Sequence, residues 1–415
     1  MSWVKKSQEE IRSNIFEALD KNVNYLNAPI IGVPGSYLDE KVFSQDKFNL
    51  NEAPFLSTLL KNPNHIGCHT MGSSENFFAG THAIEREVID ICSKDILKGG
   101  EEDFDGYIAS GGTEANIQAF WIYRNYFNRL KNAKNEEIAI ICSADSHYSM
   151  PKGSNVLNIS IFNVPVDFET REVRVEAIKE TITKAKARGI KYFIVVSNMM
   201  TTMFGSVDVI DNYSSVLLSE GVEFKIHIDG AYGGFYYPFS AEASNEINFK
   251  NPHVTSVTLD AHKMAHAPYG TGIFVIRKEY MQYATTQEAS YVEGEDCTLI
   301  GSRSGANAIA IWMILSTYGP HGWYEKILVL QRRTELVCEE LTKLNVSFYR
   351  NPKSNIITMK ADFITPEIAH HYGLVPDNHH NPKWFKIVVM EHVTMEKLTP
   401  FLVELRNSLL VNQLN

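Results

Sequence analysis

Two short motifs each carry a side chain suited to chemistry on a flat ring. Segment 227–234 reads HIDGAYGG and contains Asp229, and segment 259–264 reads LDAHKM and contains Lys263. An aspartate can pair with a protonated ring nitrogen, and small residues beside it let a ring approach the backbone. A lysine in an apolar setting has a lowered pKa, so its amine becomes a nucleophile that can form a Schiff base.

Both residues also have a simpler interpretation. Asp229 follows a predicted strand, where an aspartate often caps the next segment, and this explanation is about as well supported as a role at a ring. Most lysines lie in solvated loops, but His262, Met264 and Ala265 beside Lys263 are not typical of a solvated surface. The local sequence therefore favours a chemical role for this lysine.

A third motif predicts a phosphate site. Segment 109–116 reads ASGGTEAN, an apolar stretch followed by a turn with Gly111 and Gly112 and then a predicted helix. Backbone N–H groups at a helix start bind phosphate without basic side chains, and Thr113 adds a hydroxyl. Glycine turns before helices are common, so this motif alone is a weak signal.

A fourth motif places a histidine just after a predicted strand. Segment 143–149 reads SADSHYS, and its His147 could stack on a flat cofactor or move a proton. A hydrogen-bonded structural histidine is the commoner explanation in isolation. Together, however, the four motifs supply a phosphate cradle, a ring-facing histidine, an acid for a ring nitrogen and an amine. Pyridoxal 5′-phosphate (PLP) requires that set.

The elements that would position these motifs form an alternating pattern. Short runs rich in β-branched and aromatic residues predict strands buried on both faces, and glycine-bounded helical patterns lie between them. This alternation predicts an α/β domain with a largely parallel sheet. The predicted strands are Ile138–Cys142, Tyr192–Val196, Phe224–Ile228, Val254–Leu259 and Ile273–Ile276, and the helices between them include Glu114–Phe127 and Asp208–Glu220.

The character of the sequence changes after Gly305. A helix over Ala306–Tyr318 should stop at Gly319-Pro320, and further elements follow it to the C-terminus. We therefore expect an N-terminal arm at 1–55, a large domain at 56–304 and a smaller α+β domain at 305–415. The expected elements of the smaller domain are a helix at Tyr324–Leu344, strands at Asn355–Met359 and Phe385–Met390, and a helix from Thr394.

Bulk properties exclude several classes of protein. A net charge of −10 without a long basic run speaks against nucleic-acid or membrane partners. Five scattered cysteines without a C-x-x-C pair, and no apolar leader or span, indicate a cytoplasmic protein. The histidine pairs 370–371 and 379–380 do not share a helix face, so no metal site is predicted.

The four motifs, in their order and spacing, resemble those of the group II PLP-dependent amino-acid decarboxylases. The resemblance runs from about Asn76 to Thr394 and implies fold type I, in which a mostly parallel seven-stranded sheet is flanked by helices. It also implies that Lys263 forms the internal aldimine, Asp229 pairs with the pyridinium nitrogen, and His147 and Ala231 lie on opposite faces of the ring. The expected cofactor-binding residues are Gly111, Gly112, Thr113, His147, Thr202, Asp229, Ala231, His262, Lys263 and Ser302.

Two more segments match this family. Segment 201–208 (TTMFGSVD) resembles a stretch near the cofactor and includes Thr202. Segment 293–305 (EGEDCTLIGSRSG) resembles a mobile loop that reaches the neighbouring subunit, which implies a homodimer with composite active sites. Tyr291, just before this loop, could contribute to protonation, although a packing role is the simpler explanation.

The substrate-binding residues expected from the resemblance are Asn76, Arg303 and Lys386. Segment 385–394 (FKIVVMEHVT) resembles the stretch in which the family usually has an arginine for the substrate carboxylate, and here that position is Lys386. A lysine attracts a carboxylate but cannot grip it with two parallel bonds as arginine does.

The implied reaction is decarboxylation of an L-amino acid to an amine and CO2, through an external aldimine and a quinonoid intermediate. Related enzymes of the same fold, the aminotransferases and carbon–carbon lyases, share the lysine and aspartate, and a scaffold that only binds PLP is a further alternative. The motifs leave the substrate open among tyrosine, aspartate, histidine, glutamate and other aromatic amino acids, with a slight preference for tyrosine or aspartate.

Overall fold

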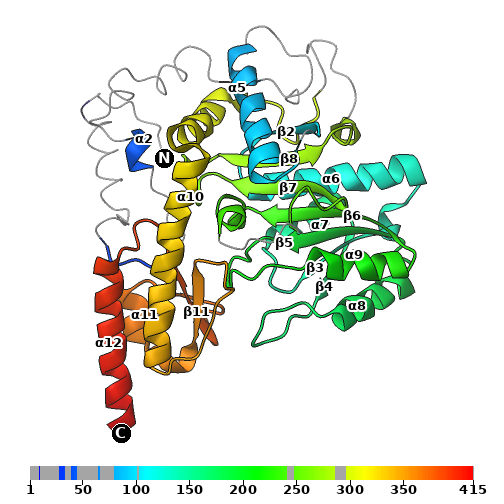
Figure 1. Ribbon diagram of the computed structural model, residues 1–415. Helices are drawn as coiled ribbons and strands as arrows, with labels where there is room; N and C mark the ends of the chain where they lie inside the picture. The colour runs from blue at the N-terminus through cyan, green and yellow to red at the C-terminus, as the bar shows by residue number, and fades with distance from the viewer. Residues whose placement is uncertain are drawn as a thin grey trace.

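The computed structural model describes residues 79–100, 102–240, 247–285 and 296–414, with short N-terminal pieces at 9, 28–32, 39–43 and 64–65. These residues form a large α/β layer and a smaller domain at the C-terminal end of the chain (Figure 1). The predicted arm at 1–55 falls mostly outside the described residues. Its described part includes Ile31, which exchanges backbone hydrogen bonds with Tyr372 and Val388 of the smaller domain.

The large domain is built on a seven-stranded sheet in the order β2-β8-β7-β6-β5-β3-β4. Strand β8 runs antiparallel to both of its neighbours, and the other pairs are parallel. This confirms the predicted fold class. The strands are β2 (Phe104–Ala109), β3 (Ile138–Ser143), β4 (Ser160–Val164), β5 (Tyr192–Asn198), β6 (Glu223–Gly230), β7 (Val254–Asp260) and β8 (Gly272–Arg277).

Helices cover both faces of this sheet because alternate strand residues enter different hydrophobic clusters. In β3, Ile140 packs in the cluster under α6, whereas Ile141 packs in the cluster under α8 and α9. The helices of this domain are α5 (Ala79–Asp90), which continues as the π-helix η2 (Ile91–Ile96), α6 (Gly112–Lys131), α7 (Ser149–Leu157), α8 (Val175–Ala187) and α9 (Ile210–Ser219). Short 3-10 turns are η3 (Asn135–Glu137), η4 (Gly233–Phe235), η5 (Tyr237–Phe239) and η6 (Met281–Ala284).

Helix α10 (Gly305–Lys343) connects the two domains (Figure 1). It contains the predicted interruption, because Gly319 has a non-helical backbone with φ of 59° and Pro320 follows it. The smaller domain has an antiparallel sheet in the order β10-β11-β13-β12. Its elements are β10 (Phe348–Tyr349), β11 (Ile356–Lys360), η7 (Ala361–Phe363), α11 (Pro366–His371), β12 (Val375–Pro376), β13 (Trp384–Val388) and α12 (Met395–Leu414).

The remaining described elements are short. Helix α2 (Glu40–Phe43) lies in the N-terminal region, and β1 (Asn64–His65) pairs antiparallel with β9 (Arg303–Ser304). Within the ranges that the structure describes, no helix has the length and apolar character needed to cross a lipid bilayer.

Candidate active site

The four motifs meet at one edge of the large sheet, where strands β3, β6 and β7 end. A cavity of about 330 Å³ opens there, and a smaller one of about 20 Å³ lies beside it. His147, Ala231 and Lys263 line both cavities. The larger cavity is lined by Ser110, Gly111, Gly112, Thr113, Glu114, Asn116, His147, Tyr148, Ala231, Asp260, His262, Lys263 and Tyr269.

Lys263 lies in the turn that follows β7. Its Nζ is 3.1 Å from Oδ2 of Asp260, the last residue of that strand. The other carboxylate oxygen of Asp260, Oδ1, is buried and has no hydrogen-bond partner among the described residues. The amine therefore lies at the cavity wall beside a carboxylate of which one oxygen contacts it and the other has no partner among the described residues.

Asp229 is buried at the end of β6, with both carboxylate oxygens bonded. Oδ1 accepts the backbone N–H of Ala231 at 3.1 Å, and Oδ2 accepts Nδ2 of Asn116 at 3.1 Å. Hydrogen bonds of this kind favour the charged form of a carboxylate. These bonds hold the carboxylate of Asp229 in one orientation beside the smaller cavity, which it lines together with Lys263.

The glycine turn begins helix α6 with no room for side chains. Gly111 is the N-cap residue and has φ of 155°, a conformation that side chains disfavour. A Cβ atom at Gly112 would lie 2.8 Å from Oδ2 of Asp260 and 3.0 Å from Cβ of Ala231. The first N–H groups of a helix have no partner within it, and the residues that carry them in α6 line the larger cavity.

The two histidines at the cavity are both neutral. Burial lowers the pKa of His147 and of His262, because it penalises the imidazolium form. Nδ1 of His147 accepts the backbone N–H of Ser149 at 3.2 Å, so its proton is on Nε2. The ring of His262 lies with its centroid 4.9 Å from that of Tyr269.

These features fit PLP as the bound group. The glycine turn is a cradle that a Cβ would fill, the orphaned Oδ1 of Asp260 lies beside it, and an amine and a buried carboxylate stand at the two cavities. When bound, PLP supplies an electron-withdrawing ring that stabilises a carbanion at the substrate Cα. The residues lining the two cavities that could hold it are Gly111, Gly112, Thr113, His147, Asp229, Ala231, His262 and Lys263.

Lys386 is hydrogen-bonded to Thr202 at the smaller cavity, but it is not itself among the residues that line either cavity. Thr202 lines the smaller cavity, and its carbonyl accepts a hydrogen bond of 2.9 Å from Nζ of Lys386. Burial, and then the positive charge of Lys263, lower the pKa of Lys386 to about 8. The predicted substrate lysine is thus close enough to Lys263 for the two charges to interact.

The structure does not bring every predicted residue to the cavity. The guanidinium of Arg303 is buried against the carboxylate of Glu85 and lies over the ring of Tyr107, and Arg303 lines neither cavity. Ser302 is exposed and lies outside the lining residues. Asn76 and Tyr291 fall outside the described residues.

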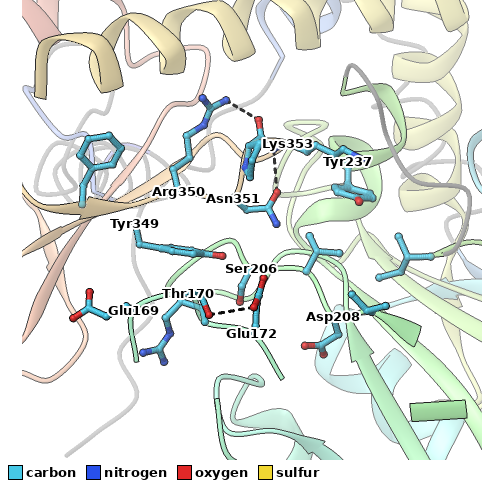
Figure 2. Close-up of a pocket in the computed structure, with 16 residues that line it drawn as sticks. Glu169, Thr170, Glu172, Ser206, Asp208, Tyr237, Tyr349, Arg350, Asn351 and Lys353 are labelled. Carbon is cyan, nitrogen blue, oxygen red and sulfur yellow. Dashed lines mark hydrogen bonds between the residues drawn. The ribbon is translucent and has the colours of Figure 1, made fainter. Parts of the chain in front are cut away.

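A larger cavity, of about 630 Å³, lies between the two domains and away from Lys263 (Figure 2). Glu169 and Asp208 line it from the large domain, and Tyr349 and Arg350 line it from the smaller one. Its lining includes none of the residues of the four motifs. Its size therefore does not make it the site of the chemistry.

One buried cluster has the spacing of a metal site but already holds a cation. Ligand atoms of Asp39, His266 and Glu391 lie within 4.8 Å of one another. Nζ of Lys326 is 3.2 Å from Asp39 and 2.9 Å from Glu391, so an ammonium group neutralises the two carboxylates.

Sequence reasoning missed three polar residues around the site. In the sequence, Asp260 is one residue of the lysine motif, and Asn116 and Ser149 are the last residues of their motifs. Each has a side chain that contacts a predicted functional residue. The signal that could have found Asn116 is its position one helical turn after Gly112, which places both on the same face of α6.

Comparisons with known proteins agree with this geometry. The pyridoxal-dependent decarboxylase conserved domain matches residues 81–365. Tryptophan decarboxylase of Clostridium sporogenes is 50% identical over 406 residues, which cover 97% of each protein. A probable L-tyrosine/L-aspartate decarboxylase of Methanosarcina barkeri is 28% identical over 372 residues, covering 85% of this chain and 91% of that protein.

Solved structures show the same fold. L-methionine decarboxylase from Streptomyces sp. 590 superposes with a TM-score of 0.79 at 20% identity, covering 97% of this chain and 95% of that one. Lactobacillus brevis glutamate decarboxylase superposes with a TM-score of 0.77 at 18% identity, covering 98% and 93%. The protein therefore belongs to the group II PLP-dependent decarboxylases and is a PLP-dependent amino-acid decarboxylase.

Proposed function

We propose that this enzyme decarboxylates an aromatic L-amino acid, with L-tryptophan as its preferred substrate. The observation that carries this proposal is the 50% identity to a tryptophan decarboxylase along almost the whole of both chains. The motifs slightly favour tyrosine or aspartate as substrate. The relatives named as probable L-tyrosine/L-aspartate decarboxylases, however, are only 28–30% identical to this chain.

The lining of the two cavities supports an aromatic rather than an acidic side chain. Among their described residues, Lys263 is the only lysine or arginine, and this amine is reserved for the cofactor. The lowered pKa values of His147 and His262 favour their neutral forms, so the described lining residues leave no further cation for a second carboxylate. Lys152, outside the lining, lies over the ring of Tyr148. At the opening, Tyr148 and Tyr269 expose 64% and 71% of their surface and offer faces for an aromatic ring.

The substrate proposal is tested with purified protein, added PLP and a panel of L-tryptophan, L-tyrosine, L-phenylalanine, L-aspartate and L-glutamate. We expect kcat/KM for L-tryptophan to exceed that for either acidic substrate by at least about 100-fold, because burying an unpaired carboxylate costs several kcal/mol. Amine release is measured by chromatography. Preference for aspartate or glutamate would overturn the aromatic proposal but leave the decarboxylase assignment intact.

We also propose that Lys386 attracts the substrate carboxylate. Only one N–H of its ammonium group is used by the carbonyl of Thr202, and the group is buried, where a charge–charge attraction is weakly screened. Lys263 would receive the cofactor, Asp229 would hold the proton on its ring nitrogen, and His147 and Ala231 would fix the ring from its two faces. The chain thereby selects which bond at Cα stands perpendicular to the ring.

Raising the pH is expected to weaken substrate binding through Lys386. Because its pKa is lowered to about 8, the ammonium is present below that pH and is lost above it. We expect KM for L-tryptophan to rise about tenfold per pH unit above about pH 8. The rise is measured from steady-state kinetics between about pH 7 and about pH 9.5.

Lys386→Arg is the matched control, because a guanidinium stays charged over this whole range. It should flatten the rise in KM, while titration of the substrate amine still affects both proteins equally. If the two proteins have the same pH profile, Lys386 does not hold the carboxylate.

We further infer that the enzyme is a cytoplasmic homodimer with composite active sites. The five cysteines are scattered along the sequence and form no C-x-x-C pair, which suits a reducing compartment. Exposed Leu299 and Ile300 lie just before Ser302, in the segment that the family resemblance assigns to the subunit interface. Light scattering of the purified protein gives the mass, and mixing inactive Lys263→Ala with inactive Ser302→Trp subunits should restore activity only if sites are shared.

A further inference from the structure

A run of buried polar side chains connects Asp229 to the protein core, and it starts at Asn116, which also lines the larger cavity. Asn116, on α6, donates to Asp229 and also bonds His227 of β6, with 2.9 Å between its Oδ1 and the imidazole Nε2. Nδ1 of His227 is 2.7 Å from Oγ of Ser256 on β7, and that hydroxyl bonds the hydroxyl of Tyr123. Asn116 is 1% exposed, and the other three are fully buried.

The direction of each hydrogen bond in this run follows from the chemistry of its groups. The carboxylate of Asp229 can only accept, so the NH2 group of Asn116 must face it, and the amide oxygen must face His227. That oxygen accepts, so Nε2 of His227 carries the proton. Burial lowers the pKa of His227 to about 4, so the ring is neutral and its Nδ1 accepts from Ser256. Tyr123 then donates to Ser256, and every donor points toward Asp229.

A second set of hydrogen bonds connects Asn116 to His147, the other residue expected to contact the ring. The second hydrogen of its NH2 group points to Oγ of Ser149, 3.1 Å away. Oγ of Ser149 is in turn 2.9 Å from Nδ1 of His147, which also accepts the Ser149 backbone N–H. The hydroxyl of Ser149 therefore donates to His147 and fixes its ring with the proton on Nε2.

We propose that Asn116 is a positioning residue that sets both ring contacts of the cofactor, holding Asp229 ionised and turned to the ring nitrogen and His147 in one tautomer. This inference rests on the proposed roles of Asp229 and His147. Donors that all point one way polarise one another, and their combined effect favours the negative charge at the end of the run. A single amide thus connects the residue expected at the ring nitrogen with the residue expected on the ring face.

The test is Asn116→Leu, which keeps the approximate shape of the side chain and removes both donors. The direct readout is the ¹⁵N chemical shift of PLP labelled at its ring nitrogen and bound to the enzyme, because this shift reports whether the nitrogen is protonated. We expect the shift to move toward that of the unprotonated ring. We also expect the dissociation constant of PLP, from fluorescence titration, to rise about 10- to 100-fold, since a hydrogen bond to a charged group is lost.

Variants of residues farther from Asp229 test whether the connected hydrogen bonds act together on its charge. Ser256→Ala and Tyr123→Phe each remove one donor that does not touch Asp229, so they should move the ¹⁵N shift in the same direction by less. Asn116→Asp puts a second carboxyl beside Asp229, and the shared proton should give the ¹⁵N shift a pH transition that the wild-type enzyme lacks. These variants keep the test decisive even if Asn116→Leu does not fold.

The matched control is Gln118→Leu, because Gln118 is another buried amide on α6. It donates to the carbonyl of Cys297 and touches neither Asp229 nor His147, so its loss should leave the ¹⁵N shift unchanged. An unchanged shift and an unchanged PLP dissociation constant in folded Asn116→Leu would overturn the inference, as would equal changes in Gln118→Leu. Wild-type protein that binds PLP but releases no amine would instead refute the proposed function and leave this result standing.

Discussion

Replacement of Lys263 by alanine is expected to lower the rate of amine formation by at least about 1,000-fold. The reason is that covalent catalysis depends on a nucleophile, and enzymes that lose theirs retain only the part of the rate that comes from binding and orientation. In this chain the amine lies at the cavity wall, 3.1 Å from Asp260. Without it, PLP would have no covalent attachment to the protein.

The loss of attachment is measured by borohydride reduction followed by mass spectrometry of the peptide that contains residue 263. Wild-type protein should carry a reduced pyridoxyl group on Lys263, and the variant should carry none. The control is Lys278→Ala, because Lys278 is exposed and pairs with Asp103 away from the cavity. A pyridoxyl group on any other lysine of the wild-type protein would contradict the assignment.

The second large effect is expected for Asp229→Asn, which should lower kcat about 100- to 1,000-fold. Removing one partner of a buried charge pair costs about 3–5 kcal/mol, and each 1.4 kcal/mol is a factor of ten in rate. An asparagine cannot hold a proton on the ring nitrogen by its charge. Its NH2 group would also face either the amide of Asn116 or the N–H of Ala231, which are both donors.

Stopped-flow kinetics with saturating PLP separate this loss of rate from weaker cofactor binding. The control is Asp105→Asn, because Asp105 is a buried aspartate near the opposite end of β2 and lines neither cavity. We expect this control to lose less than about fivefold in kcat. A similar loss in both variants would mean that Asp229 acts through stability alone.

Local sequence patterns were enough to predict the main strands and the chemistry at their ends. Strands β3, β5, β7 and β8 are runs rich in β-branched, aromatic and other apolar residues, as burial on both faces requires, whereas β6 also contains Lys225 and His227. The motif residues follow strands directly, and parallel strands bring such positions to one edge without further information. This is why Lys263, Asp229 and His147 could be expected near one another before any coordinates.

The sequence did not predict strands β2 and β4, because their own residues lack the pattern of a buried strand. Strand β4 is at the edge of the sheet and only its last residue is fully buried, so its apolar pattern is weak. Strand β2 contains Asp105 and Gly106, which interrupt the run of apolar residues that marks a buried strand. Their places in the sheet depend on pairing with β3 and β8, residues distant in sequence.

Only the tertiary structure decided which polar groups meet. Asn116 and Asp229 are 113 residues apart and bond each other, and Arg303 pairs with Glu85 across 218 residues rather than facing the cavity. Strand-end position fixes the edge of the sheet on which a side chain lies, but not its partner. The partner depends on how α6 and α5 pack on the sheet, because hydrogen bonds and buried ion pairs require distances that only the assembled core sets.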